Sequence, residues 1–513
     1  MNGAESLLAS LVAGGIEICF MNPGTTEIHL VEALDRVERL RAVSCLFEGV
    51  ASGAADGYAR MTGKPASTLF HLGPGLSNAL ANLHNACRAK VPMVNIVGDH
   101  ATFHRPFDPP LAADIEAIAR PFSQWLKTST AVGDLGREGA EAIAAALQTP
   151  GRIATLVVPS DVAWSEGGCI AGPLTASPAP MPRGSQIEEA ARLLRNGEPC
   201  AILLGAPMMQ GTALVAVARI AAATGAKLLA PFAFARMERG AGRPVVERIP
   251  YISEPAGALL AEFRQLILVG APEPVAFFGH PARTSRLAPE GCKIFQLASV
   301  EEDCAGALAV LVETLNAADA APQLQQNETR PSPQGEIGLN GLADAVAATL
   351  PENAIIVDES ITSGRGLMSA TRGAPPHDYL VNTGGSIGIG TPLAIGAAIA
   401  APDRAVLCLE GDGSFMYTLQ ALWTAARENL AITTVVFANR NYQILKGELS
   451  ALGTNPGPRA ATTLDIAPPD IDFAGLSKSL GVAASRVTTL EEFTAALRRG
   501  FESRAPNLIE VPL

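Results

Sequence analysis

A single carboxylate in a glycine turn, followed at a distance by an amide, is the pattern in this chain best suited to chemistry. Asp412 lies between Gly411 and Gly413, and Asn439 follows 27 residues later at the end of an apolar run. Glycines let a backbone approach a ligand closely, and a helix beginning near residues 415–418 would point free N–H groups toward an anion. A hard cation such as Mg²⁺ accepts carboxylate, amide and phosphate oxygens as ligands. The pattern indicates a metal–diphosphate clamp, although Gly-Asp-Gly alone is also a common turn.

The elements that would position these groups are alternating strands and helices. The first 165 residues alternate apolar segments such as EICFMNPG and RAVSCLF with helical segments such as EGVASGAADGYARMTG. Near-continuous apolar strands that alternate with helices predict a parallel, doubly wound sheet. Ligands of such sheets bind beyond the carboxyl ends of the strands, which is where Asp412 and Asn439 are expected.

Three blocks of this kind follow one another along the chain. A length of 513 residues exceeds what one core supports. The Pro/Gly/Ala-rich stretch 167–185 and the polar stretch 317–336 are typical of linkers. We therefore predict an α/β fold of three doubly wound parallel-sheet domains, with limits 1–166, 186–316 and 337–513.

Composition excludes several classes of function. The net charge of −12 and the lack of a basic cluster argue against nucleic acid and anionic membrane surfaces as partners. Apolar stretches end before about 18 residues, so no transmembrane helix is expected. The N-terminal MNGAESLLASLVAGGIEICF has no basic n-region, unlike a signal peptide. The eight cysteines form no CxxC pair, which is typical of a reducing cytoplasm and indicates no zinc site. We expect a cytoplasmic protein.

The stretch from EGDGSF to ANRNY resembles the cofactor motif of thiamine diphosphate (ThDP) enzymes, in which an Asn pair follows GDG. This chain has Ala438 where the first Asn is usual and keeps Asn439. The resemblance implies that Asp412 and Asn439 bind Mg²⁺ through their side chains, with a main-chain oxygen near Asn441. LFEGVASGAADGYARMTGKPA and GGSIGIGTPLAIGAAIA are similar to two more signatures of the acetolactate synthase and 2-oxo acid decarboxylase superfamily. The implied order is a pyrimidine-binding, a middle and a diphosphate-binding domain.

Further cofactor contacts follow from the same resemblance. Glu48 begins a predicted helix, where the helix dipole alone favours an acid. By resemblance it is the glutamate that hydrogen-bonds N1′ of the aminopyrimidine and so helps to form the C2 carbanion. Ile387 by itself looks like a core residue, but it matches the apolar wedge beneath the cofactor. The implied cofactor-binding set is Glu48, Ser360, Ser363, Gly385, Ser386, Ile387, Gly411, Asp412, Gly413, Ser414, Asn439 and Asn441.

The histidines bear on the reaction that follows cofactor activation. His71 ends the strand STLFHL, at a position where benzoylformate decarboxylase has a histidine. His280, in VAFFGHPARTS, is the candidate for that enzyme's second histidine, although a lone His is more often structural and the two interpretations of His280 stay equally open. Thr25, in MNPGTTE, stands where a substrate-binding serine is expected. The stretch 98–121 instead looks like acetolactate synthases, and no clear FAD-binding signature occurs in the middle domain, so FAD is left open without support.

We expect a ThDP- and Mg²⁺-dependent 2-oxo acid decarboxylase, in which protonation or carboligation to a second carbonyl follows loss of CO₂. The catalytic candidates are Glu48, His71, His280 and Thr25. The first alternative is an acetolactate synthase catalytic chain, and the second is a ThDP-binding protein without catalysis, which would not need Glu48. A nucleotide-binding oxidoreductase is disfavoured because no GxGxxG opens a helix after the first strand. Relatives bind the cofactor between subunits, which implies a homodimer or homotetramer acting on a small 2-oxo acid.

Overall fold

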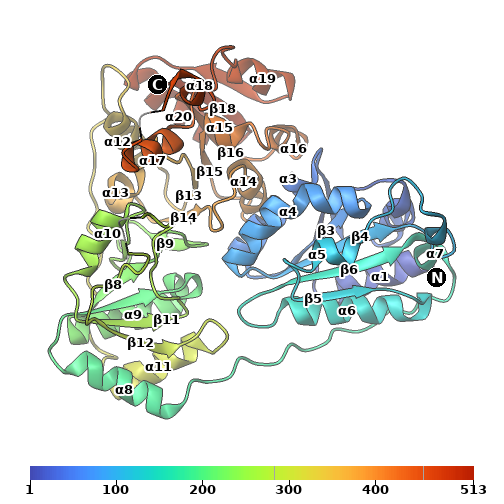
Figure 1. Cartoon of the computed structure of the whole chain (residues 1–513), viewed down its shortest axis with the longest axis horizontal. Coiled ribbons are helices and arrows are strands. Elements are labelled where there is room, and N and C mark those ends of the chain that lie inside the picture. Colours follow the sequence, from blue (N-terminus) through green and yellow to red (C-terminus); the bar gives the residue numbers. More distant parts are fainter. Residues whose placement is uncertain (282–283, 455) are drawn as a thin grey trace.

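The computed structural model describes residues 1–281, 284–454 and 456–513 and arranges them in three α/β blocks, each built on its own sheet (Figure 1). The expected fold class is confirmed. No helix within these ranges combines the length and the apolar character needed to cross a membrane.

The first block holds a six-stranded parallel sheet in the order β2-β1-β3-β4-β6-β5. Along β4, Met93 and Val97 pack with α3 and α4, whereas Val94 and Ile96 pack with α1 and α6. This alternation buries both faces of the sheet, as expected for parallel strands. The strands are β1 Ile18–Asn22, β2 Arg41–Ser44, β3 Ala66–Phe70, β4 Met93–Asp99, β5 Trp125–Thr128 and β6 Ile153–Pro159. The helices are α1 Gly3–Ala13, α2 Ile28–Ala33, α3 Glu48–Thr62, α4 Leu72–Ala89, α5 Ile115–Ala119, α6 Leu135–Ala146 and α7 Ser160–Trp164.

The middle block holds a five-stranded sheet in the order β10-β8-β7-β11-β12. Its strands are β7 Cys200–Leu204, β8 Lys227–Ala230, β10 Glu247–Arg248, β11 Gln265–Val269 and β12 Lys293–Ala298. Its helices are α8 Gly184–Arg195, α9 Gly211–Thr224, α10 Ser253–Leu260 and α11 Cys304–Thr314. One strand of this segment, β9 Met237–Arg239, instead pairs antiparallel with β14 at the edge of the third sheet. Arg236, which precedes β9, donates to Asp378 on β14 at 2.7 Å and so helps to hold this edge.

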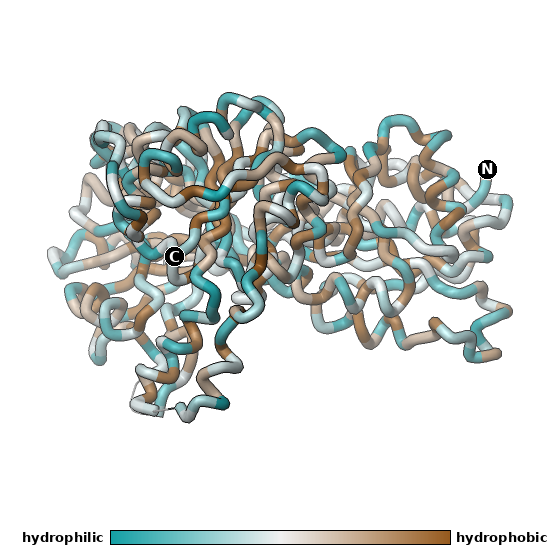
Figure 2. The backbone as a smooth tube through the Cα atoms, turned by 90° about the horizontal axis from the view of Figure 1, so that it is seen from above, coloured by the Kyte–Doolittle hydropathy of each residue, from teal (hydrophilic) through white to brown (hydrophobic). Residues whose placement is uncertain are grey.

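The third block holds a seven-stranded sheet in the order β17-β18-β16-β15-β13-β14-β9. Over the whole chain, hydrophilic residues gather mainly on the outer loops (Figure 2). Its remaining strands are β13 Ile355–Glu359, β14 His377–Val381, β15 Val406–Gly411, β16 Ile432–Ala438, β17 Ala483–Arg486 and β18 Asn507–Pro512. Its helices are α12 Leu339–Thr349, α13 Leu367–Ala370, α14 Gly390–Ala400, α15 Asp412–Phe415, α16 Ala421–Arg427, α17 Gln443–Ala451, α18 Pro458–Thr462, α19 Phe473–Ser479 and α20 Leu490–Ser503.

Helices α3 and α14 join the first and third blocks at close range (Figure 1). A Cβ at Gly57 would lie 2.1 Å from the carbonyl oxygen of Leu393, and a Cβ at Gly396 would lie 2.0 Å from that of Ala54. Only glycine permits backbones to approach this closely. The packing therefore fixes α3, which begins at Glu48, against the third block.

Candidate active site

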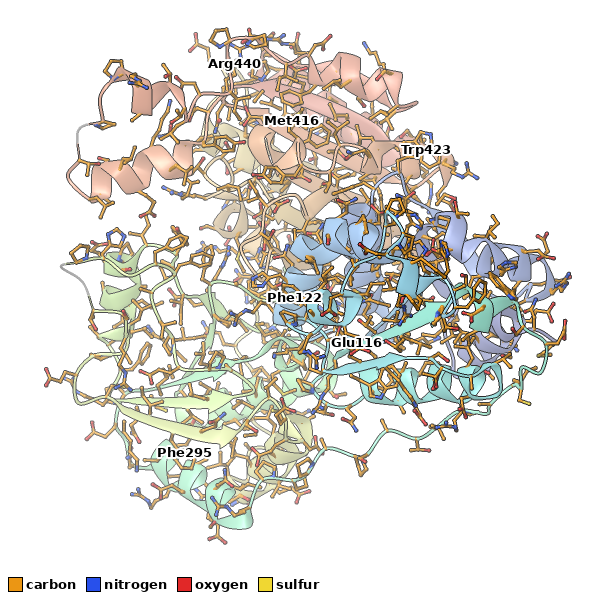
Figure 3. The ribbon with its side chains drawn as sticks, turned by 45° about the vertical axis from the view of Figure 1, so that its right-hand side comes forward. Glu116, Phe122, Phe295, Met416, Trp423 and Arg440 are labelled. Carbon is orange, nitrogen blue, oxygen red and sulfur yellow. The ribbon has the colours of Figure 1, made fainter. Side chains whose placement is uncertain are left out.

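Asp412 and Asn439 follow neighbouring parallel strands, β15 and β16, and so lie at the same edge of the third sheet. The backbone N–H of Arg440 donates to Asp412 Oδ2 at 2.6 Å, and that of Gly413 donates to Asp412 Oδ1 at 2.8 Å. Asn439 Oδ1 accepts from the N–H of Asn441 at 3.1 Å. The carboxylate is thus held directly against the 439–441 turn. Met416 and Arg440, which follow these two strand ends, lie at the same end of the block (Figure 3).

This group of oxygens fits a hard divalent cation. The Asp412 side chain is buried, and burial raises the pKa of its carboxyl above the ordinary value despite the N–H groups of Arg440 and Gly413 and the charge of Arg440. Asn441 Oδ1 is also buried and has no hydrogen-bond partner among the described residues. The sequence pointed to a main-chain oxygen near Asn441, whereas the structure leaves this side-chain oxygen as a further free ligand. The expected helix start near 415–418 is wrong by about a turn, because α15 begins at Asp412 itself.

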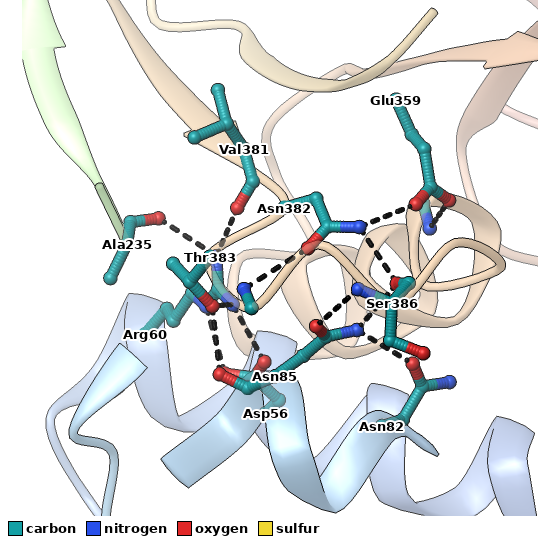
Figure 4. Close-up of polar contacts among 12 residues, drawn as sticks. Asp56, Arg60, Asn82, Asn85, Ala235, Glu359, Val381, Asn382, Thr383 and Ser386 are labelled. Atoms are coloured by element: carbon teal, nitrogen blue, oxygen red, sulfur yellow. Dashed lines mark hydrogen bonds and ion pairs between the residues drawn. The ribbon is translucent and has the colours of Figure 1, made fainter. Parts of the chain in front are cut away.

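The predicted cofactor loop joins β14 to α14 and is held by side chains on both sides (Figure 4). Asn382 Nδ2 and Asn85 Nδ2 both donate to the carbonyl of Ser386, at 2.7 and 2.8 Å. Gly385 has a φ of +79°, a conformation that favours glycine, and it faces the ring of Phe277. Ile387 is partly exposed, so its side chain is accessible to a ligand on this edge.

The serines expected near the diphosphate have different partners. Ser360 is buried after β13 and donates from its backbone N–H to Asp358 Oδ1 at 3.0 Å. Ser363 is buried one turn further, where its N–H donates to the carbonyl of Ser360 at 3.0 Å. Ser414 is buried within α15, two residues after Asp412. All three lie on segments that follow β13 or β15, at the same edge as Asp412.

Two buried glutamates beneath this loop were not predicted from the sequence. Glu359 is the last residue of β13 and Glu410 the next-to-last residue of β15, and the two are paired in register. Burial raises the pKa of Glu359 to about 7, and burial together with the charge of Glu359 raises the pKa of Glu410 well above the ordinary value. Two adjacent carboxyls in a low-dielectric interior cannot both ionise readily, so the pair favours holding a proton. The only signal in the sequence was an acid at each strand end.

Glu48 lies at the carboxyl edge of the first sheet, at the N-terminus of α3. Its side chain is buried, and Glu48 Oε2 accepts from Asn78 Nδ2 of α4 at 3.0 Å. A Cβ at Gly75 would lie 2.9 Å from Glu48 Oε1, so glycine keeps α4 close to the carboxylate. Glu48 is therefore a buried carboxylate fixed by two helices.

His71 at the end of β3 contacts a carboxylate that sequence reasoning missed. His71 Nδ1 lies 2.8 Å from Glu27 Oε2 and 3.3 Å from Thr26 Oγ1. Glu27 is fully buried and also accepts from the N–H of Gly24 at 2.8 Å. The predicted Thr25 opens this turn, but its neighbours Thr26 and Glu27 make the contacts to the imidazole. The sequence signal that could have identified Glu27 was its place in NPGTTE, on the same loop as the predicted Thr25.

His280 lies elsewhere, against α17 of the third block. His280 Nε2 lies 3.2 Å from Glu448 Oε2, and the hydroxyl of Tyr251 donates to Glu448 Oε1 at 3.3 Å. Burial and the charge of Glu448 raise the pKa of Tyr251 to about 12. His280 is thus held beside the helix that follows the Asn439–Asn441 turn, and no hydrogen bond joins it to His71 in the described part of the chain.

The chain presents these groups as two separate clusters. Across residues 1–281, 284–454 and 456–513, no hydrogen bond or ion pair links the cluster of Glu27, Glu48 and His71 to that of Asp412, Asn439 and Asn441. The first block instead contacts the cofactor loop through Asn85 and Arg60, seen in Figure 4, and through Asn82, which donates to the carbonyl of Gly388 at 3.3 Å.

Comparison with known proteins identifies the family. The N-terminal TPP binding domain of thiamine pyrophosphate enzymes matches residues 1–118, and the C-terminal TPP binding domain matches residues 364–511. The chain is 50% identical to IlvX of Mycobacterium tuberculosis, which carries the provisional name of an acetolactate synthase large subunit, over 100% of this chain and 99% of the relative. It is 27% identical to benzoylformate decarboxylase of Pseudomonas aeruginosa, over 97% and 96% of the two chains.

A solved structure agrees over the whole length. The thiamine diphosphate-dependent 4-hydroxybenzoylformate decarboxylase of Rhodococcus jostii RHA1 matches with a TM-score of 0.89 and 25% identity, covering 100% of this chain and 99% of that one. The glycine turn with Asp412, the buried Glu48 and the three α/β blocks fall within this match. The chain belongs to the thiamine pyrophosphate enzymes.

Proposed function

We propose that this chain is a ThDP- and Mg²⁺-dependent enzyme that decarboxylates a 2-oxo acid and either releases the aldehyde or joins the remaining acyl unit to a second carbonyl. The observation that carries the proposal is the His71–Glu27 pair, which lies at the same sheet edge as Glu48. The pair supports the proposal because it would offer an acid–base group to substrate beside Glu48.

ThDP, when bound, would supply a nucleophilic C2 carbanion for the substrate carbonyl and a thiazolium ring as the electron sink for decarboxylation. The oxygens of Asp412, Asn439 and Asn441 would hold Mg²⁺, which neutralises charge on the diphosphate. Glu48 would hold a proton at N1′ of the aminopyrimidine. Ile387 would support the cofactor from below, with Gly385, Ser386 and the buried serines near its diphosphate.

The geometry around His71 defines its proposed role. Because Nδ1 faces the carboxylate of Glu27, Nε2 is the nitrogen left to face a substrate. The hydrogen bond from Nδ1 to Glu27 orients the imidazole ring, so Nε2 would exchange a proton with the substrate carbonyl oxygen. Thr25, on the same turn, would bind the substrate carboxylate. His280, held by Glu448, would act from the third block.

Assembly of the two halves requires a second subunit in this proposal. We infer a homodimer or homotetramer in which Glu48 of one chain meets Asp412 of another. Support comes from the two clusters, which no hydrogen bond joins within the described residues of one chain. We also propose domain limits of 1–166, 186–316 and 337–513 and a cytoplasmic location.

The test is a product analysis of the protein reconstituted with ThDP and MgCl₂. Pyruvate and phenylglyoxylate are supplied separately, and CO₂, aldehyde and ligation product are measured, with Glu48→Gln as the control. Release of CO₂ and aldehyde by the wild type alone supports the proposal. Exclusive formation of acetolactate from pyruvate would favour the second candidate, an acetolactate synthase. The similarity to IlvX supports this second candidate. If neither acid releases CO₂ in a ThDP-dependent way, the proposal that the chain decarboxylates them is refuted.

A further inference from the structure

One buried carboxylate shapes the loop between β14 and α14. Glu359 is 2% exposed, and its Oε2 accepts from the backbone N–H of Gly388 at 3.1 Å and that of Gly390 at 2.7 Å. Its Oε1 accepts from Asn382 Nδ2 at 2.9 Å, as Figure 4 shows. Glu359 thus binds the loop at its beginning and at its end.

The direction of these hydrogen bonds is fixed by the remaining contacts of Asn382. Its Oδ1 accepts from the N–H of Gly385 at 2.8 Å and from that of Gly384 at 3.2 Å. Its Nδ2 also donates to the carbonyl of Ser386 at 2.7 Å. The amide therefore cannot rotate to offer its oxygen to Glu359 without losing these bonds. Since backbone N–H groups only donate, residue 359 must accept on both of its oxygens, which a carboxyl group does and an amide does not.

The residue between these fixed points is Ile387. On one side the carbonyl of Ser386 is bound by Asn382. On the other side Gly388 has a φ of +93°, and its carbonyl accepts from Thr418 Oγ1 at 2.8 Å. The loop therefore presents Ile387 on a backbone that is held by hydrogen bonds before and after it.

We propose that Glu359 is a positioning residue, which sets the height of the Ile387 side chain beneath the bound cofactor through its bonds to Asn382, Gly388 and Gly390. This inference rests on the proposed function, in which Ile387 supports the cofactor. It assigns no contact between Glu359 and ThDP. A purely structural carboxylate would stabilise the block without acting through Ile387.

The first experiment needs no cofactor. In Glu359→Gln, amide hydrogen–deuterium exchange of the apo protein should quicken in the peptide covering 384–390 by at least about tenfold, because one acceptor becomes a donor. The matched control is Glu510→Gln, since Glu510 is a buried carboxylate of the same sheet that accepts from the N–H of Ala474 at 3.0 Å. Exchange of 384–390 should stay unchanged in that control. Unchanged exchange in Glu359→Gln overturns the proposal.

The second experiment separates anchoring from positioning. With ThDP and MgCl₂, the Kd of Glu359→Gln for ThDP should change by less than about threefold, because Asp412 is intact. Hydrogen–deuterium exchange at C2 of the bound cofactor should slow by roughly 10- to 100-fold, the scale of a displacement near 1 Å. Slower C2 exchange with an equal loss of affinity would indicate general damage and overturn the positioning role.

A double-mutant cycle tests whether the effect passes through Ile387. Ile387→Ala should slow C2 exchange while leaving the apo loop's amide exchange normal. Glu359→Gln combined with Ile387→Ala should be no slower than Ile387→Ala alone, because the two residues act on one contact. Additive effects would overturn the proposal.

If Glu359→Gln does not fold, Asn382→Ala removes the same bond from the other side and should give the same pattern in both exchange measurements. Unaltered C2 exchange in that variant overturns the inference. Failure of the proposed function is a separate result. A wild type that binds ThDP but releases no CO₂ would refute decarboxylation, while loop exchange and C2 exchange would still decide the role of Glu359.

Discussion

Replacing Glu27 by Gln removes a negative charge beside His71 with little change of shape. Glu27 is fully buried, and its Oε2 serves both His71 Nδ1 at 2.8 Å and the N–H of Gly24 at 2.8 Å. The amide oxygen of Gln can occupy the Oε2 position and keep both contacts. The variant therefore tests the charge of the carboxylate rather than the packing of the turn.

The expected loss is the difference between a hydrogen bond to a charged group, about 1.5–3 kcal/mol, and one between neutral groups, about 0.5–1.5 kcal/mol, and so is about 1–1.5 kcal/mol. Because Glu27 is shielded from solvent, no discount for screening applies. Each ~1.4 kcal/mol changes a rate tenfold, so kcat/KM for CO₂ release should fall by roughly 5- to 12-fold. Cofactor activation depends on Glu48, so C2 exchange of bound ThDP should change little.

The assay compares kcat/KM for CO₂ release with C2 exchange in the same preparations. The control is Glu138→Gln, which alters a buried carboxylate of the same block paired with Lys127 Nζ at 3.2 Å and should leave CO₂ release within about twofold of wild type. A loss below about twofold in Glu27→Gln, under the range expected for losing the charge, would refute the reasoning. So would an equal loss in C2 exchange, because that outcome indicates damage to the cofactor site.

Four further outcomes are expected. Asp412→Ala should abolish ThDP retention even with excess MgCl₂, since the diphosphate loses its bridging cation; stoichiometric ThDP in the purified variant, by mass spectrometry, contradicts this. Mixed Asp412→Ala and Glu48→Gln chains should regain part of the activity on co-refolding, whereas a fully active monomer by light scattering excludes shared sites. Burial lowers the pKa of His377 to about 3 from its usual 6.5, so the unfolded state binds more protons between these values and stability falls as pH drops below about 6.5. At pH 5 this costs about 2 kcal/mol, and His377→Asn should reduce the difference in urea unfolding free energy between pH 7 and pH 5 by that amount; an unchanged difference rules it out. Gly57→Val should destabilise by about 3 kcal/mol or more in the same assay because its side chain meets the Leu393 carbonyl, and a wild-type midpoint would contradict the close packing.

The local pattern was sufficient for the fold class and for the groups proposed to bind the cofactor. Alternating apolar strands and helices predict parallel sheets because the periods of a strand and of a helix are each visible within a few residues of sequence. The same holds for the Gly411–Gly413 turn and Asn439, since parallel strands end at one edge and so place both residues together. Strand β9 was not predicted to join the third sheet, because pairing with β14 depends on residues more than a hundred positions away.

Tertiary structure alone decided which side chains meet. Glu27 and His71 come from different loops, and their contact exists because β1 and β3 are neighbours in the sheet. Glu359 and Glu410 become a buried pair only when β13 and β15 align in register. Periodicity and spacing report on neighbours along the chain, whereas burial, proton sharing and hydrogen-bond direction depend on neighbours in space. The sequence could therefore name Glu48, Asp412 and Asn439, but only the folded chain could show which carboxylate holds His71 and which holds the loop of Ile387.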